Sequence, residues 1–338
     1  MADGRKIGWG ILGTGNIARQ FCSGVRDCER GQLAAVGSRT AASAAEFAGQ
    51  YAISKSYPTY EQVIADKAVD AIYISLPNSM HCEWTIRALE AGKHVLCEKP
   101  IAANEAEARR MFETADRAGK VLVEAFMYRA HPQTKEVMEK IRSGIVGEVK
   151  LIRSSFCYRT GRMEGNIRWD AGLAGGSLMD VGCYCINFSR MVAGAEVIEV
   201  QASGKLHESG VDEMVVGNLK FANGLLADFS CGMRVQGDNS AYVCGSEGYL
   251  EVPWPWKPQA QGAKYWLKRS APPRQDGGKT AASPSEEFVV NAGMDLYGLE
   301  ADEFAGTVLE GRSPMVSGEE TIANMKVLDE MRRQVGVR

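Results

Sequence analysis

The run from Lys93 to Pro100 ends in residues whose types suit chemistry. His94 to Cys97 is short and mostly apolar, as is typical of a buried strand in a parallel sheet. Two opposite charges follow, Glu98 and Lys99. The next residue is proline, which disfavours a helical conformation at Lys99, so both charges should stay at the strand's carboxyl end. Open α/β sheets bind ligands there, and the alternative is a solvated ion pair without a function.

Asp180 and Tyr184 form a second candidate pair. They lie four apart in a predicted helix that begins behind two glycines and continues to about Val192, so they should share a face. A carboxylate and a phenol at the start of a helix can project together into a cleft. The alternatives are that Asp180 completes a capping box with Ser177, and that Tyr184 is a core tyrosine of an amphipathic helix.

A glycine-rich turn joins a predicted strand and helix near the start of the chain. Gly13, Gly15 and Ala18 match the G-x-G-x-x-G/A dinucleotide fingerprint. The first glycine permits the tight turn, the second lets backbone approach a pyrophosphate, and the helix N-terminus offers N–H groups. We therefore expect a dinucleotide site whose first contacts come from five consecutive residues: Gly13, Thr14, Gly15, Asn16 and Ile17.

Ser38 and Arg39 follow the second predicted strand, where an NAD site usually has an acidic residue for the ribose hydroxyls. A hydroxyl and a guanidinium suit a 2′-phosphate, because arginine offers charge and forked donors together. This pattern favours NADP, with NAD as the alternative. The competing interpretation of Arg39 is a surface residue. His81, in the first turn of a later helix, either lines the cofactor cleft or is a polar residue on an exposed turn.

Strands and helices alternate in the first part of the chain. We expect strands at 6–12, 32–38, 70–75, 93–97 and 120–125, and helices at 15–26, 40–51, 59–66, 79–91 and 104–119. Asn104, with Glu107 three residues on, predicts the start of the last helix. The alternation implies an α/β fold with a doubly wound parallel sheet. Gly13, Arg39 and Lys99 should then lie at one edge of that sheet, with Asn78.

The pattern changes after residue 127. We expect a helix at 131–143, strands at 147–158, 196–206, 212–221, 224–233, 239–245 and 248–252, and closing helices near 293–310 and 318–334. Several strands alternate apolar and polar residues, which predicts a largely antiparallel sheet with one open face. Asn223-Gly224 predicts a tight hairpin, and Pro253 to Ser285 an irregular excursion. The chain length favours two domains, 1–127 and 128–338.

The composition argues against several classes of protein. The chain has 338 residues and a formal net charge of −3, which gives no reason to expect nucleic acid or a membrane as partner. Nine cysteines occur without CxxC spacing, so buried free thiols in a reducing compartment are expected, and neither they nor the four histidines predict a metal. The amino terminus runs into an apolar strand without a signal-peptide core, which predicts a cytoplasmic location.

Four motifs occur in a fixed order: the glycine turn at 13–18, Leu76-Pro-Asn-Ser-Met-His81, Glu98-Lys-Pro100 and Gly175-Gly-Ser-Leu-Met-Asp-Val-Gly-Cys-Tyr184. Together they resemble the glucose-fructose oxidoreductase/inositol dehydrogenase/MocA family over nearly the whole chain. The resemblance implies an N-terminal Rossmann domain and a C-terminal α+β domain with an open-faced sheet that often forms the dimer contact. A homodimer or homotetramer is therefore expected. The resemblance also implies catalysis by Lys99, Asp180 and Tyr184 beside the nicotinamide.

Tyr184 departs from the many family members that have histidine there. This departure favours the branch that resembles dimeric dihydrodiol dehydrogenase, NADP-linked aldose dehydrogenases and glucose-fructose oxidoreductase. The last is typically exported with an extra amino-terminal arm, and because no such arm is expected before the first strand here, the resemblance to it ranks lower. In that branch an Arg/Trp segment, similar to Asn166-Ile-Arg-Trp169, approaches the cofactor. The remaining expected contacts are Leu76, Pro77, Asn78, His81, Glu98, Arg168 and Trp169 for the cofactor, and Tyr128, Arg129 and Tyr297 for the substrate.

Tyr184 is the expected general acid/base of hydride transfer. An ordinary tyrosine pKa of about 10 is too high for this work, but the Lys99 ammonium and the positive nicotinamide ring would favour the phenolate. Asp180 would oppose this in direct contact, so it is expected to orient Lys99 or a substrate hydroxyl. Instead of contacting the substrate, Arg129 could pair with a carboxylate where the two domains meet. The expected substrate is a sugar or related polyol.

Two other functions stay open. A dihydrodiol or dicarbonyl substrate competes with a sugar, since substrate loops vary freely on one fold. In another class, the chain would be a non-catalytic NADP(H)-binding regulatory protein. Such a protein need not keep a proton-transfer residue, so the presence of both Lys99 and Tyr184 weighs against it.

Overall fold

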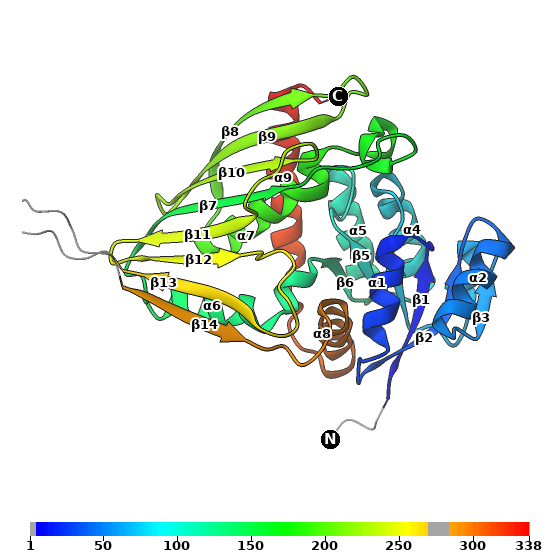
Figure 1. Cartoon of the computed structure of the whole chain (residues 1–338). Coiled ribbons are helices and arrows are strands. Elements are labelled where there is room, and N and C mark those ends of the chain that lie inside the picture. Colours follow the sequence, from blue (N-terminus) through cyan, green and yellow to red (C-terminus); the bar gives the residue numbers. More distant parts are fainter. Residues whose placement is uncertain (1–4, 270–283, 338) are drawn as a thin grey trace, which may run out of the picture. The chain divides into compact units, whose positions relative to one another are not determined.

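The computed structural model describes residues 5–269 and 284–337, which form two compact units (Figure 1). Unit 1 comprises Met1–Ala130, Asp170–Gly175 and Met294–Lys326, and unit 2 comprises His131–Trp169, Gly176–Gly293 and Val327–Arg338. Two later segments of the chain therefore return to unit 1. The pattern change near residue 127 marks only the first crossing between the units.

Unit 1 is built on a parallel sheet that, in the described chain, has six strands in the order β3-β2-β1-β4-β5-β6. The strands are β1 (Ile7–Leu12), β2 (Gly31–Gly37), β3 (Lys55–Tyr57), β4 (Ala71–Ile74), β5 (His94–Glu98) and β6 (Leu122–Ala125). This arrangement confirms the predicted Rossmann fold. Strand β3 was not predicted, because three residues carry no readable alternation.

Helices flank this sheet. They are α1 (Asn16–Val25), α2 (Ala41–Tyr51), α3 (Tyr60–Ala65), α4 (His81–Glu90), α5 (Glu105–Ala118) and α8 (Leu296–Glu310). Their starts follow from the sequence: Thr40, Thr59 and Asn104 each accept a hydrogen bond from the backbone N–H three residues on. Aromatic packing joins α1 to the sheet, since the Phe21 ring stacks on Tyr73 with centroids 3.7 Å apart.

Unit 2 contains a second sheet, with eight strands among the described residues, in the order β14-β13-β12-β11-β7-β10-β9-β8. Its strands are β7 (Val149–Cys157), β8 (Val197–Leu206), β9 (Asp212–Phe221), β10 (Leu226–Gly232), β11 (Ser240–Gly245), β12 (Tyr249–Pro253), β13 (Ala263–Lys268) and β14 (Ser285–Val290). Among the described strands of this sheet only the β7–β10 pair is parallel, which confirms a largely antiparallel sheet. The prediction of an irregular segment from Pro253 to Ser285 is wrong where β13 forms. Residues 270–283 of that segment lie outside the described chain.

Helices cover one face of this sheet and leave the other open (Figure 1). They are α6 (Pro132–Arg142), α7 (Cys183–Ala193) and the last part of α9 (Gly318–Val335). Tyr265 of β13 donates a 2.6 Å hydrogen bond to Glu136 of α6, and Met331 of α9 packs against Gly217 of β9. Burial alternates along β9, as expected for a strand with one solvated face.

The state of the cysteines agrees with the prediction of buried free thiols. All nine cysteines are free and eight are buried. Within 5–269 and 284–337, no helix is long and apolar enough to cross a membrane. The same residues contain no cluster of three or more His, Cys, Asp or Glu side chains suited to hold a metal ion.

Candidate active site

The glycine turn between β1 and α1 leaves a helix N-terminus open. Gly13 has φ +100°, a conformation that side chains disfavour, and its N–H donates to the Gly37 carbonyl at 3.0 Å. Gly15 is the N-cap residue of α1 and provides no side-chain cap. Gly15 and Asn16 are exposed, so backbone N–H groups at this terminus can receive an anion such as a pyrophosphate.

The end of β2 meets this turn. The Ser38 hydroxyl lies 3.3 Å from the Thr14 hydroxyl, so the two loops expected to hold the nucleotide are adjacent. Arg39 is exposed. Burial raises the pKa of Tyr60 while the Arg39 charge opposes that shift, which places the guanidinium within electrostatic range of the Tyr60 phenol. A hydroxyl and an exposed cation therefore follow β2 beside the open turn.

His81 braces two loops at the sheet edge. Its ring is fully buried, with Nδ1 2.9 Å from the Pro100 carbonyl oxygen and Nε2 2.9 Å from the Leu76 carbonyl oxygen. The alternative of an exposed turn is therefore wrong, and a cofactor contact by His81 stays a prediction. The neighbouring Asn78 amide donates to the Ala174 carbonyl at 2.8 Å.

Glu98 ends β5 within a buried acidic group. The Tyr73 hydroxyl donates to its Oε1, and Lys99, half-buried, follows it. Burial and the Glu98 charge hold the pKa of Glu300 well above its usual range. Burial and the same Glu98 charge raise the pKa of Tyr297. Tyr297, an expected substrate contact, thus lies near Glu98, an expected cofactor contact.

Glu124 on β6 faces Lys99 from within unit 1. It is fully buried, and its Oε1 accepts a 2.9 Å hydrogen bond from the Ile101 N–H. Burial raises the pKa of Glu124 to about 7, although the charges of Lys99 and Arg129 oppose that shift. Arg129 forms a 3.1 Å ion pair with Glu320, so its predicted carboxylate partner lies inside unit 1.

Glu124→Gln should flatten the pH dependence of stability. Because the folded carboxyl has the higher pKa, the native state holds a proton that the unfolded chain releases, and stability falls as pH rises from about 4.5 to about 7. The loss should be roughly 3 kcal/mol in the wild type. Glutamine can still accept from Ile101 and carries no titrating proton. Urea unfolding at pH 5 and pH 8 measures this.

The matched control for Glu124→Gln is Glu61→Gln, which removes an exposed carboxylate on α3. Its stability should follow the wild-type pH curve. A Glu124→Gln variant with an unchanged slope between pH 5 and pH 8 would show that Glu124 ionises normally in the folded state.

In unit 2, Asp212 of β9 fixes the segment that carries Asp180. Asp212 Oδ2 accepts from the Ser177 hydroxyl at 2.6 Å and from the Leu178 N–H at 2.7 Å. The capping box between Ser177 and Asp180 is therefore wrong. Gly176 has φ +113°, and a Cβ there would lie 2.2 Å from Asp212 Oδ1, so this position requires glycine.

Tyr158 and Arg168 both bind the Asp180 side chain. Its Oδ2 accepts a 2.6 Å hydrogen bond from the Tyr158 hydroxyl and a 2.8 Å bond from Arg168 Nε. The Asp180 charge raises the pKa of Arg168, and burial with that same charge raises the pKa of Tyr158. Asp180 is therefore an anion between a cation and a neutral phenol. Neither partner was predicted.

Tyr184 lies one helical turn after Asp180, and its ring is closely packed. Residues 178–182 form a π-helical turn before α7, a geometry frequent at functional sites. Tyr184 is 3% exposed, and its ring lies 5.3 Å from Phe156 and 6.0 Å from Trp256, between centroids. Its ring is thus buried as a core tyrosine would be, and its role in proton transfer stays a prediction.

The expected cofactor contacts Arg168 and Trp169 differ in their surroundings. Trp169 is 6% exposed and packs with Val211 and Met233, with its ring 4.7 Å from His207. Arg168 keeps 39% of its side chain exposed while it binds Asp180. Tyr128 is fully buried. Their contacts with cofactor or substrate stay predictions, as does the joint action of Lys99 in unit 1 with Tyr184 in unit 2.

The parallel sheet with its open glycine turn defines a dinucleotide-binding Rossmann protein. Residues 7–126 match the oxidoreductase family with NAD-binding Rossmann fold, and residues 134–251 match the GFO/IDH/MocA C-terminal domain. The chain belongs to the GFO/IDH/MocA family of oxidoreductases.

Known proteins are similar to this chain over nearly its whole length. A D-xylose 1-dehydrogenase (NADP(+)) of Haloferax volcanii is 32% identical and matches over 95% of each chain. A trans-1,2-dihydrobenzene-1,2-diol dehydrogenase of Mus musculus is 32% identical over 97% of each chain. Among solved structures, an aldose-aldose oxidoreductase of Caulobacter crescentus has a TM-score of 0.86 at 29% identity over 98% of each chain.

Proposed function

We propose that the chain is an NADP(H)-dependent oxidoreductase that transfers hydride between nicotinamide and a secondary or anomeric CH–OH group, or the matching carbonyl, of a sugar or related polyol. The observation that carries this proposal is the tightly packed Tyr184 phenol near the ionised Asp180–Arg168 pair in an oxidoreductase of this family. The relative named as an NADP(+)-linked xylose dehydrogenase supports the choice of cofactor and substrate class.

Proton transfer is the task of the protein's own side chains, because nicotinamide supplies only the hydride acceptor or donor. Tyr184 takes the hydroxyl proton during oxidation and returns it during reduction. The Arg168 cation, which interacts with Tyr184, favours the phenolate in oxidation. Lys99 supports the same charge and donates to a substrate hydroxyl. Asp180 orients these groups.

The proposed contacts follow the sequence predictions. Cofactor contacts are Gly13, Thr14, Gly15, Asn16, Ile17, Ser38, Arg39, Leu76, Pro77, Asn78, His81, Glu98, Lys99, Arg168 and Trp169, and substrate contacts are Tyr128, Arg129 and Tyr297. The open N-terminus of α1 and the Thr14–Ser38 approach support the nucleotide set.

A dihydrodiol or dicarbonyl substrate is the second candidate. Phe156, Trp256 and Tyr184 form an aromatic cluster, with the Phe156 and Trp256 rings stacked at 5.8 Å. Because the Tyr184 and Trp256 rings are buried, this cluster makes the surroundings of the Tyr184 phenol largely apolar, which suits a planar apolar substrate. The relative named as a dihydrodiol dehydrogenase supports this candidate.

A substrate panel separates the candidates. Aldoses, polyols, a trans-dihydrodiol and a dicarbonyl are assayed at 340 nm in both directions, each with NADP(H) and NAD(H). We expect the highest kcat/KM with an aldose and NADP. Higher turnover of the dihydrodiol would select the second candidate. NADP(H) binding without turnover of any compound would point to a regulatory protein instead.

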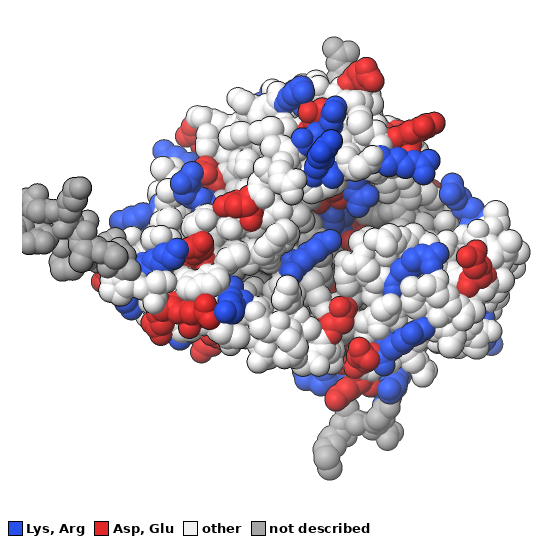
Figure 2. Space-filling view, viewed as in Figure 1, with Lys and Arg blue, Asp and Glu red and all other residues white. Residues whose placement is uncertain are grey.

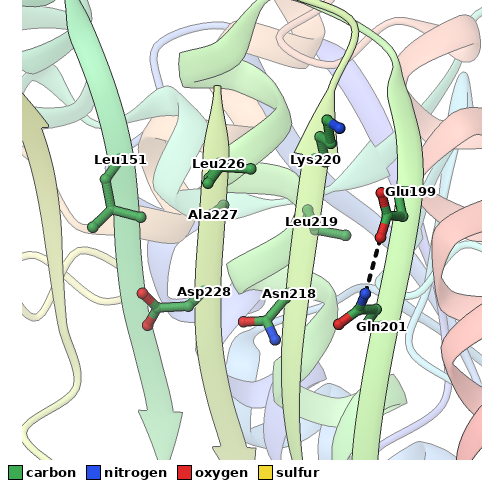
Figure 3. Close-up of a pocket in the computed structure, with 9 residues that line it drawn as sticks. All are labelled: Leu151, Glu199, Gln201, Asn218, Leu219, Lys220, Leu226, Ala227 and Asp228. Carbon is green, nitrogen blue, oxygen red and sulfur yellow. Dashed lines mark hydrogen bonds between the residues drawn. The ribbon is translucent and has the colours of Figure 1, made fainter. Parts of the chain in front are cut away.

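We also propose that the open face of the second sheet joins two copies of this chain, as a homodimer or within a homotetramer. Val216, Leu226 and Val289 are exposed apolar residues on its strands. A pocket of about 300 Å³ lies on this sheet, and its lining includes Leu151, Leu226 and Ala227 beside polar residues of β8 and β9 (Figure 3). A face that pairs apolar and hydrogen-bonding groups suits a dimer contact.

Leu226→Glu should convert the assembly to monomers. Leu226 is 49% exposed, so the monomer can accommodate the charge, whereas a dimer contact would bury it unpaired. Light scattering after size exclusion measures the mass. Ile167→Glu is the control, since Ile167 is an exposed apolar residue outside the sheet, and it should leave the mass unchanged. A wild-type monomer, or a dimeric Leu226→Glu variant, would exclude this interface.

The remaining proposals concern partners and location. Basic and acidic side chains are interspersed on the face shown in Figure 2, which supports small-molecule partners over nucleic acid. We propose a cytoplasmic location, because nine free cysteines suit a reducing compartment.

A further inference from the structure

We propose that Tyr158 is a positioning residue for the hydride-transfer reaction, and that with Arg168 it fixes the Asp180 carboxylate one turn before Tyr184. This inference rests on the proposed function. It adds a second tyrosine whose hydroxyl never meets the reacting atoms and acts only through Asp180.

The geometry assigns this task to three separate segments. Tyr158 directly follows β7, Arg168 lies in the 3-10 turn Ile167–Trp169, and Asp180 lies in the π-helical turn. Both donors end on the same carboxylate oxygen, Oδ2, at 2.6 and 2.8 Å. Two donors from different directions fix an aspartate rotamer more firmly than one does, and charge-assisted bonds of this length are strong.

Tyr158 is itself held independently of Asp180. Its backbone N–H donates to the Gly232 carbonyl at 2.9 Å, and its ring packs against the buried cluster of Trp169, Val211 and Met233. The ring therefore has a fixed place before its hydroxyl bonds to anything. Tyr158→Phe should keep this packing and remove only the hydrogen bond.

Charge explains why the reaction needs this bond. Within unit 2, Tyr158 and Arg168 interact electrostatically with Asp180, Arg168 interacts with Tyr184, and the Cys183 thiol donates to the Asp180 backbone carbonyl. An uncompensated Asp180 anion one turn away would oppose phenolate formation at Tyr184. The hydrogen bond from the Tyr158 hydroxyl and the ion pair with Arg168 partly offset that negative charge.

The test is the pH profile of alcohol oxidation by Tyr158→Phe. With a bond to a charged group lost, kcat should fall about tenfold. The acid limb of the kcat profile should move to higher pH by about 0.5 to 1 unit, because Asp180 then acts more strongly on Tyr184. The Kd for NADP(H) should stay at the wild-type value. The matched control is Tyr265→Phe, which removes another 2.6 Å tyrosine–carboxylate bond in unit 2 and should leave the profile in place.

A second background separates positioning from packing. Asp180→Asn removes the anion, so its acid limb should move to lower pH, and adding Tyr158→Phe should cause no further shift. A wild-type profile in Tyr158→Phe, or an equal shift with and without Asp180, would overturn the inference and leave the proposed function standing. A wild-type chain without turnover on the panel would overturn the proposed function and, with it, the reaction that Tyr158 serves.

Discussion

Tyr184→Phe should lower kcat by about a hundredfold or more in both directions, while the Kd for NADP(H) stays within about twofold of the wild-type value. The phenol oxygen is the proposed proton carrier, and phenylalanine keeps the ring that packs against Phe156 and Trp256. Loss of the hydroxyl should therefore remove the chemistry and leave the fold intact. Steady-state kinetics and fluorescence titration with NADPH measure the two quantities.

Tyr265→Phe serves as the control here too, because Tyr265 is a buried tyrosine of the same unit without a proposed role. It should keep the wild-type kcat. Full turnover in Tyr184→Phe would assign the proton transfer to another group, and a parallel loss of NADP(H) binding would make Tyr184 a structural residue.

Arg39→Asp should reverse the cofactor preference. The variant loses a cation that can bind a 2′-phosphate and gains a carboxylate that accepts hydrogen bonds from ribose hydroxyls. Since a hydrogen bond to a charged group contributes about 1.5–3 kcal/mol and like charges repel, the ratio of kcat/KM for NADP over NAD should fall by about a hundredfold or more. The ratio is measured with one substrate at saturating concentration.

Arg87→Asp is the matched control for Arg39→Asp. Arg87 lies on α4 with 47% of its side chain exposed, and its replacement changes the net charge equally. Its NADP/NAD ratio should equal the wild-type ratio. An unchanged ratio in Arg39→Asp would show that the 2′-phosphate is recognised elsewhere or that NAD is the natural cofactor.

Local signals in the sequence predicted much of the fold. Asn104 accepts from the Glu107 N–H at 2.9 Å and begins α5 as expected, because a cap depends on residues three apart. Gly224, with φ +86°, forms the predicted hairpin between β9 and β10. The sheet of unit 1 followed from strand–helix alternation, which leaves few topologies open.

The contacts that shape the candidate site could not be predicted in the same way. Tyr158 and Asp180 are 22 residues apart, and no periodicity links a strand end to a π-helical turn. The predicted capping box between Ser177 and Asp180 does not form, because Ser177 instead donates to the buried carboxylate of Asp212 on β9. Strand β13 lies in a stretch rich in Pro, Gly and Trp, whose composition hides its alternation.

The buried acidic group near β5 was also outside the reach of sequence patterns. Tyr73 lies within the apolar strand β4, and its hydroxyl donates a hydrogen bond to Glu98. Glu300 enters the group from α8, more than 200 residues later, and burial with the Glu98 charge raises its pKa. This shift in the pKa of Glu300 depends on a neighbour that only the folded chain supplies.

Packing also determines how readily the cysteine thiols of this protein react with oxidants. Only thiolates react readily with peroxides or disulfides. Burial raises the pKa of Cys22 and of Cys28 to about 12, and eight of the nine cysteines are buried. The native chain is therefore chemically inert at most of its thiols, and that inertness ends wherever the structure opens. Conformational stability and resistance to thiol oxidation should consequently rise and fall together in this protein.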